Sequence, residues 1–269
     1  MAETDLGKKV FFLYPPSVIK DELITRLRDK EFEIYMFSDM NKFNRIIRLY
    51  PDSICFINID AGMDEPKWEE WIRTTIADPA LAQLKLGIVT YNSDEQLQKK
   101  YLMDIGLQCG FIKLKLGLEE STRILITILQ ANEAKGRRKY VRAFCSHDTI
   151  SGVNIRTGSI ETSGKIFDIS VVGFSCILNP DPGFVKNSLV PDIQLKLRAS
   201  LVRASAIVFG SRIVDDRTMY VMLFSQKMDD HANDRIRAFI QNTLQTEIEI
   251  QADTADVITQ PDVIDSQKT

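Results

Sequence analysis

The sequence predicts two fold classes in one chain: an N-terminal α/β domain with a doubly wound parallel sheet, followed by an all-β C-terminal barrel with a closing helix. The first observation is an alternation of short apolar runs with helix-period segments from residue 8 to residue 134. The second is a change to period-two alternation after Gly136, and the third is one amphipathic segment at 229–246. We therefore expect domains at 1–134 and 135–249.

Five apolar runs in the first half predict buried strands, because a strand covered on both faces of its sheet reads as a continuous apolar run. The helix-period segments between them predict the crossover helices that parallel strands require. The expected strands are 10–14, 32–37, 53–59, 84–90 and 109–114, and the expected helices lie around 17–27, 40–50, 68–72, 97–102 and 118–131. This order favours a doubly wound sheet.

The second half alternates with a period of two, most clearly at Ile193–Arg198. Turn residues separate many of these runs, as is typical of an antiparallel barrel or sandwich. The expected strands are 140–144, 159–169, 174–178, 193–198, 204–214 and 219–224, and the inner face of the final helix carries Ile236, Phe239, Ile240 and Leu244. Residues 250–269 hold four Asp and one Lys, which predicts a loosely ordered acidic tail.

Composition sets the broad class of the protein. An apolar share of 44% with 26% charged residues is normal for a globular chain, and a net charge of −3 argues against general nucleic-acid binding. The N-terminus lacks the apolar core of a signal peptide, and no apolar stretch is long enough to cross a bilayer. The four cysteines show no metal-binding or redox spacing. We therefore expect reduced thiols and a cytoplasmic protein.

A basic run, Lys135–Arg142, carries five cations in eight positions at the expected domain junction. By itself it fits a solvated linker after a helix that ends at Gly136. The segment Asp168-Ile-Ser-Val-Val-Gly173 changes that interpretation. In an extended strand Asp168 and Ser170 share a face, and a glycine at Gly173 is expected to leave room for a ligand beside the backbone.

Together the two segments resemble the PilZ domain family, bacterial receptors for cyclic di-GMP. Arg138 and Arg142 match the family's Arg-x-x-x-Arg motif, and Asp168–Gly173 matches its Asp/Asn-x-Ser-x-x-Gly motif. The resemblance covers about 135–245 and implies a PilZ-type barrel that binds cyclic di-GMP, without catalytic residues or a cofactor. The implied ligand-binding residues are Arg137, Arg138, Arg142, Asp168, Ser170 and Gly173.

These residue types suit a guanine-containing phosphodiester. A guanidinium can bridge the N7 and O6 acceptors of guanine, and a carboxylate such as Asp168 can accept from the donors on its Watson–Crick edge. Arginines also neutralise phosphate oxygens and stack on purines. In the ligand-free protein we expect Asp168 to pair with the arginines, so that binding exchanges one set of ion pairs for another.

The position of the basic run suggests an effector. Ligand at the junction would change the orientation of the two domains and thereby the binding of a protein partner. The resemblance points to motility, adhesion or virulence control, with a flagellar motor or regulatory protein as partner. A ligand-independent adaptor is the alternative for this half of the chain. Ligand stoichiometry and oligomeric state stay open at this point.

The first half resembles a receiver domain of bacterial signalling over about 8–134. Asp60 ends the third expected strand, where receivers carry their phospho-accepting Asp, and Asp60–Met63 is similar to their Asp-x-x-Met. Thr90 and Lys113 match further receiver positions at the ends of strands four and five.

One departure from the receiver pattern concerns the metal. Receivers hold Mg²⁺ through acidic residues after the first strand, and this chain has Tyr14-Pro-Pro-Ser17 there. Without carboxylates the ion lacks its hard oxygen ligands. We expect a receiver-like module that is not phosphorylated and mediates partner or interdomain contacts. A response regulator driven by phosphorylation of Asp60 is the alternative.

Other candidate sites are weaker. Cys145-Ser-His-Asp148 has the ingredients of a nucleophile relay, but such groups are brought together by folding and not by adjacency. Two histidines and no paired cysteines disfavour zinc. Glycine-rich phosphate and dinucleotide motifs are absent from the sequence. We therefore expect a binding protein and not an enzyme, with no metal.

Overall fold

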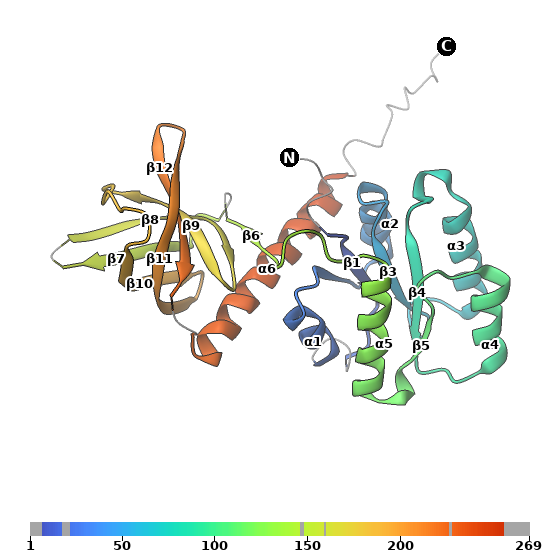
Figure 1. The fold of residues 1–269 in the computed structure, drawn as a ribbon. Coiled ribbons are helices and arrows are strands. Elements are labelled where there is room, and N and C mark those ends of the chain that lie inside the picture. The colour runs from blue at the N-terminus through green and yellow to red at the C-terminus, as the bar shows by residue number, and fades with distance from the viewer. Residues whose placement is uncertain (1–6, 18–21, 146–147, 159, 226–227, 256–269) are drawn as a thin grey trace, which may run out of the picture. The chain divides into compact units, whose positions relative to one another are not determined.

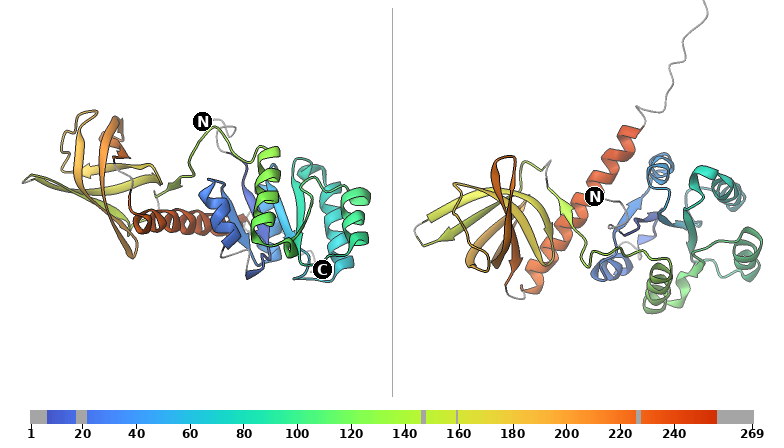
Figure 2. Two further views of the ribbon diagram at one scale, coloured as in Figure 1. Left: turned by 60° about the horizontal axis from the view of Figure 1, so that its bottom comes forward. Right: turned by 45° about the horizontal axis from the view of Figure 1, so that its top comes forward.

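The computed structural model describes residues 7–17, 22–145, 148–158, 160–225 and 228–255. The chain forms two compact units (Figures 1 and 2). The α/β unit comprises Met1–Lys139 together with Glu247–Thr269, and the barrel unit comprises Tyr140–Thr246. Among the described residues, no helix combines the length and the apolar character that crossing a membrane requires.

A five-stranded parallel sheet forms the centre of the α/β unit. Its strand order is β2-β1-β3-β4-β5, so the order reverses between β1 and β3, as in doubly wound sheets. The predicted fold class of this half is confirmed. The strands are β1 (Val10–Leu13), β2 (Ile34–Phe37), β3 (Ile54–Asn58), β4 (Lys85–Thr90) and β5 (Phe111–Lys113).

Helices cover both faces of this sheet (Figure 2). Val10 and Phe12 of β1 pack with Leu27 of α1 and Leu125 of α5 in one core cluster. The alternate residue, Phe11, packs its ring on Tyr35 and Phe37. The helices are α1 (Ile24–Asp29), α2 (Met40–Leu49), α3 (Glu65–Ala77), η3 (Pro79–Leu81), α4 (Glu95–Lys99), η4 (Lys100–Ile105), η5 (Leu114–Leu116) and α5 (Leu118–Ala131).

A closed ring of six antiparallel strands forms the barrel unit, and this predicted fold class is also confirmed. The ring runs β8-β7-β10-β11-β12-β9 and closes because β9 also pairs with β8. A seventh strand, β6, pairs with β8 outside the ring. The strands are β6 (Ala143–Phe144), β7 (Gly152–Thr157), β8 (Ile160–Ser170), β9 (Gly173–Asn179), β10 (Leu189–Leu197), β11 (Ser200–Val214) and β12 (Arg217–Phe224).

Strand β7 is the element that the sequence reading missed. Val153 and Ile155 are buried in the barrel core, while Asn154 and Arg156 between and after them are exposed. This is period-two alternation, so the signal was present. Only two apolar residues carry it, which is why the run was not among the expected strands.

The last helix, α6 (Asp230–Thr254), is longer than expected. The predicted inner-face residues Ile236, Phe239, Ile240 and Leu244 are buried, and Ile248 and Ala252 continue the same stripe. The helix therefore extends into the segment for which an acidic tail was expected, and residues 256–269 lie outside the described part. In the α/β unit, its final turns reach helix α2: Asp253 pairs with Lys42 at 2.8 Å, and the Ala252 carbonyl accepts from Arg45.

A close backbone approach between β8 and β9 gives a test of the packing in the barrel unit. A Cβ at Gly164 in β8 would lie 2.0 Å from the carbonyl oxygen of Ile177, whereas a Cβ at Gly210 in β11 would meet open space. We expect Gly164→Ala to destabilise the barrel unit by about 1–3 kcal/mol, as overpacking does, and Gly210→Ala to change little.

Hydrogen exchange of the barrel strands measures the effect. Both tryptophans, Trp68 and Trp71, belong to the α/β unit, so tryptophan fluorescence during urea unfolding reports on that unit as an internal reference. Equal exchange protection in the two variants would contradict the expected clash.

Candidate functional site

An ion pair joins two of the predicted site residues. The Arg142 Nη1 donates to Asp168 Oδ1 at 2.9 Å, and the other carboxylate oxygen accepts from the Ser175 hydroxyl at 2.6 Å. The Asp168 side chain is only 8% exposed, whereas that of Arg142 is 40% exposed. The predicted pairing of Asp168 with an arginine is therefore present for Arg142, and it compensates for burying the carboxylate.

Strand pairing explains why these three side chains meet. Strand β9 pairs with β8 so that Ser175 lies directly opposite Asp168. Strand β6 pairs with the other side of β8, with Phe144 opposite Asp168. Arg142 is two residues from Phe144, so both face the same side as Asp168. Ile169 faces the opposite side and is fully buried in the barrel core.

Ser170 and Gly173 flank the two-residue turn between β8 and β9. They are paired across the hairpin, and the Ser170 hydroxyl donates to the Gly173 carbonyl at 3.2 Å. Ser170 is 1% exposed, and its hydroxyl links the two strands of the hairpin. Its part in ligand binding stays a prediction.

The predicted reason for Gly173 is wrong. We expected the missing side chain to leave room for a ligand, but a Cβ there would lie 2.1 Å from the Met222 carbonyl oxygen of β12. The glycine is needed because two backbones approach closely. Its part in ligand binding stays a prediction.

Arg137 and Arg138 lie in the segment before β6, in which residues 136–142 form neither helix nor strand. Both belong to the α/β unit, while Arg142 belongs to the barrel unit. The structure thus brings together Arg142 and Asp168, and separately Ser170 and Gly173. The placement of Arg137 and Arg138 beside them stays a prediction.

Ser175 is the functional candidate that the sequence reading missed. A signal for it existed, because a two-residue turn that pairs Ser170 with Gly173 also sets Asp168 opposite Ser175. The turn residues are Val171 and Val172, which lack the Asn, Asp or Gly that usually marks such a turn.

Asp60 of the α/β unit has a different environment. Its two carboxylate oxygens accept from the Thr90 hydroxyl and from the Tyr91 backbone amide. Lys113 lies opposite Thr90 on β5. The carboxylate is thus held by neutral donors at the carboxyl ends of the strands.

Tyr14 is the residue that directly follows β1. Its ring lies against Gly62, where a Cβ would be 2.5 Å from the Tyr14 Cε2, and packs edge-on against Trp68. Its carbonyl accepts from the Asn58 side chain at 2.8 Å. In the described part of the chain, no three His, Cys, Asp or Glu side chains are grouped to hold a metal ion. An aromatic ring thus fills the space beside Asp60's strand.

Asp148, the last residue of the Cys145–Asp148 run, organises a turn. It accepts from the backbone amides of Ile150 and Ser151 and from Arg198. Burial, the largest single effect, raises the pKa of Asp148, but these hydrogen bonds and that of the Ser151 hydroxyl outweigh it and lower the pKa below its usual value. Cys145 is buried, and His147 lies outside the described residues.

Comparison with known proteins gave structural matches only. No family model and no curated protein matches the sequence. The PilZ domain with c-di-GMP of YcgR from Escherichia coli matches with a TM-score of 0.37 and 13% identity, over 44% of this chain and 98% of that chain. The K. pneumonia MrkH–c-di-GMP complex matches with a TM-score of 0.38 and 18% identity, over 44% of this chain and 57% of that one.

A third match is the Bacillus subtilis inhibitor of motility, MotI/DgrA, with a TM-score of 0.33 and 16% identity, over 42% of this chain and 51% of that one. The matched region thus spans about half the length of MrkH and MotI.

The environment of Asp60 leads to a prediction about phosphorylation. Incubation of the protein with acetyl phosphate and Mg²⁺ should leave its intact mass unchanged, because the described residues include no group of acidic side chains that could hold the ion with Asp60. A receiver with its acidic residues serves as the positive control. A stoichiometric phosphate adduct that disappears in Asp60→Asn would contradict this expectation.

Proposed function

We propose that the protein is a cyclic di-GMP-binding effector and not an enzyme. The observation that supports this most is the ion pair between Arg142 and Asp168. It holds a half-exposed guanidinium beside a buried carboxylate on the outward side of a closed barrel. The proposed ligand-binding residues are Arg137, Arg138, Arg142, Asp168, Ser170 and Gly173.

The ion pair offers both halves of a guanine recognition site. The guanidinium has donors for the N7 and O6 acceptors of the base, and the carboxylate can accept from N1–H and the exocyclic amine. In the ligand-free protein each satisfies the other, so neither charge is left bare. Ligand binding would then exchange the Arg142–Asp168 pair for pairs with the base.

Arg137 and Arg138 would act on the phosphates. They lie on the connection between the two units, five and four residues before Arg142. A dianionic ligand held by cations of both units would restrict the orientation of one unit relative to the other. This becomes a signal only if the ligand has different affinities for two arrangements. The receiver of that signal would be a protein partner in motility or virulence control, such as a flagellar motor or regulatory protein.

Two alternatives belong to other classes. A phosphorylation-driven response regulator would use Asp60, and the Tyr14 ring in place of acidic residues disfavours it. A ligand-independent adaptor would use the barrel as a scaffold only, and the Arg142–Asp168 pair disfavours it, since a scaffold does not need a charge at that place. The first experiment below separates the adaptor from the effector.

Truncating the arginines should weaken binding of cyclic di-GMP. We expect Arg138→Ala or Arg142→Ala to cost about 2–4 kcal/mol of binding free energy, the range for removing one partner of a desolvated charged contact. Titration calorimetry on the full chain measures it. Arg142→Lys keeps the charge beside Asp168 but loses the fork, so it should also weaken binding while preserving the fold.

The control for this titration is Arg156→Ala. Arg156 is an exposed arginine of β7 whose weak contact is with Glu161, so its loss should leave the affinity unchanged. Thermal unfolding of each variant separates lost binding from lost folding. Unchanged affinity in both Arg138→Ala and Arg142→Ala would contradict the assignment of the ligand site.

A second expectation concerns the arrangement of the two units. Small-angle scattering of the full chain should change on addition of cyclic di-GMP, because the ligand restricts the connecting segment. Arg142→Ala supplies the control, since its curve should not respond at the same ligand concentration. Superimposable curves with and without bound ligand would argue against coupling of occupancy to domain orientation.

A further inference from the structure

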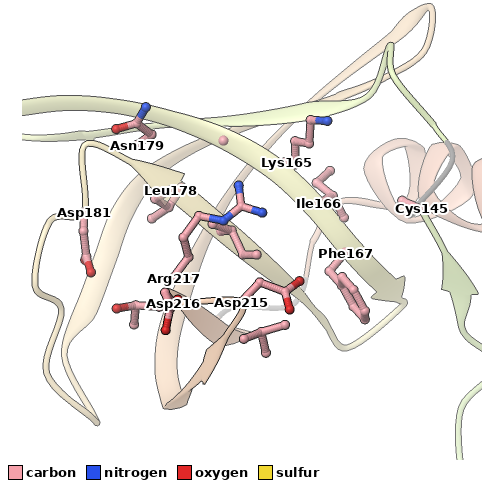
Figure 3. A pocket seen from close by; sticks show the side chains of 14 residues that line it. Cys145, Lys165, Ile166, Phe167, Leu178, Asn179, Asp181, Asp215, Asp216 and Arg217 are labelled. Atoms are coloured by element: carbon pink, nitrogen blue, oxygen red, sulfur yellow. The ribbon is translucent and has the colours of Figure 1, made fainter.

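A pocket of about 680 Å³ lies wholly within the barrel unit (Figure 3), and neither Arg142 nor Asp168 lines it. Strands β8 and β9 form one side of it, and the turn between β11 and β12 forms the other. Its volume falls in the range of about 300–1,000 Å³ that is typical of small-molecule sites. The residues that carry its chemistry are Lys165, Phe167, Ile177, Asp215 and Arg217.

Two cations face this pocket. Lys165 of β8 and Arg217 of β12 are both exposed, and neither forms a salt bridge with any residue that the structure describes. Arg217 extends from the hairpin toward the strand that carries Lys165 (Figure 3). Strand β9 lies between the strands of these two cations: its Ile177 pairs with Lys165 of β8 on one side and with Met219 of β12 on the other. Two cations on facing walls, without a salt bridge to any described residue, suit an anion.

The carboxylates of the lining differ in what they already bind. Asp181 accepts hydrogen bonds from Thr218, Tyr220 and the Gly183 amide, and these lower its pKa, so it is committed to the protein. Asp215 and Asp216 form the two-residue turn with φ of 49° and 58°, a turn that matches the twist of the hairpin. Both are exposed, and Asp215 lies on the side of Phe167 (Figure 3). Asp215 therefore offers an acceptor beside an aromatic ring.

Phe167 supplies the planar contact. The pairing of β8 with β9 shifts register between Ile166 and Asp168, and Phe167 is the extra, unpaired residue. At such a bulge the side chains no longer alternate regularly between the two faces of the strand. The ring is half-buried and packs edge-on against Phe144, so one part of it stays open to the pocket. Ile177 adds an apolar surface. Aromatic faces of this kind stack on nucleobases.

We propose that this pocket is a second nucleotide subsite that takes a guanine-containing phosphate ester, with Lys165 and Arg217 on the phosphate, Asp215 on the donors of the base and Phe167 stacked on its face. The inference rests on the proposed function, because it extends the same ligand chemistry along one strand: Phe167 directly precedes Asp168. The chain would then bind two guanine nucleotides in the barrel unit, at sites with different side chains.

Amide NMR of the ¹⁵N-labelled full chain tests this with two probes, cyclic di-GMP and GMP, added separately. Either probe should shift the amides of 164–167 and 214–218. Cyclic di-GMP should also shift those of 168–175. Arg217→Gln should weaken the response of 164–167 and 214–218 about tenfold in midpoint concentration, the loss of one charge-assisted hydrogen bond, and leave that of 168–175 in place.

The control is Arg203→Gln, an exposed arginine of β11 outside the pocket, which should change neither response. Cyclic di-GMP shifts confined to 168–175, with no response of 214–218 to either probe, would overturn the second subsite and keep the proposed function. A response of 214–218 alone would keep the subsite and overturn the site at Arg142. Equal midpoints in Arg217→Gln and wild type would also overturn the assignment of Arg217.

Discussion

The desolvated carboxylate of Asp168 is the constraint on which the rest of the site depends. A charge that is 8% exposed is costly unless donors surround it, and Arg142 and Ser175 are the two that the fold provides. Ser175 reaches it because β9 closes the ring by pairing with β8, and Arg142 reaches it because β6 adds to the outside of β8. Both contacts of Asp168 therefore depend on the strands that pair with β8.

Much of the fold could be predicted from periodicity, and the exceptions have physical causes. Helix α5 has the predicted bounds because its apolar residues recur at helical spacing and a glycine precedes its first residue. Strand β7 was missed because two apolar residues, Val153 and Ile155, carry its whole pattern. The end of α6 was misplaced because acidic composition outweighed Ile248 and Ala252, which continue the apolar stripe. Tertiary packing of that stripe, not local propensity, keeps the last turns helical.

The candidate site divides along similar lines. Residue spacing was enough to place Asp168 and Ser170 on one face and to anticipate an arginine partner, because both follow from strand geometry and charge. The role of Gly173 and the presence of Ser175 depend on strand register and on the approach of β12, which a single sequence does not encode locally. The same holds for Tyr14, whose ring occupies space beside Asp60's strand that only the assembled sheet defines.

The division of α6 between the units makes the barrel unit an insertion in topological terms. The chain leaves the α/β unit after Lys139 and re-enters it at Glu247, so the barrel unit is tethered at both ends. The first connection is an irregular basic segment, and the second lies inside helix α6. A helix is stiffer than an irregular segment, so the two connections differ in flexibility. No single cut in the chain separates the units, and a fragment that ends at the barrel also removes part of its neighbour. Separating either unit from the other thus requires the chain to be cut at two places.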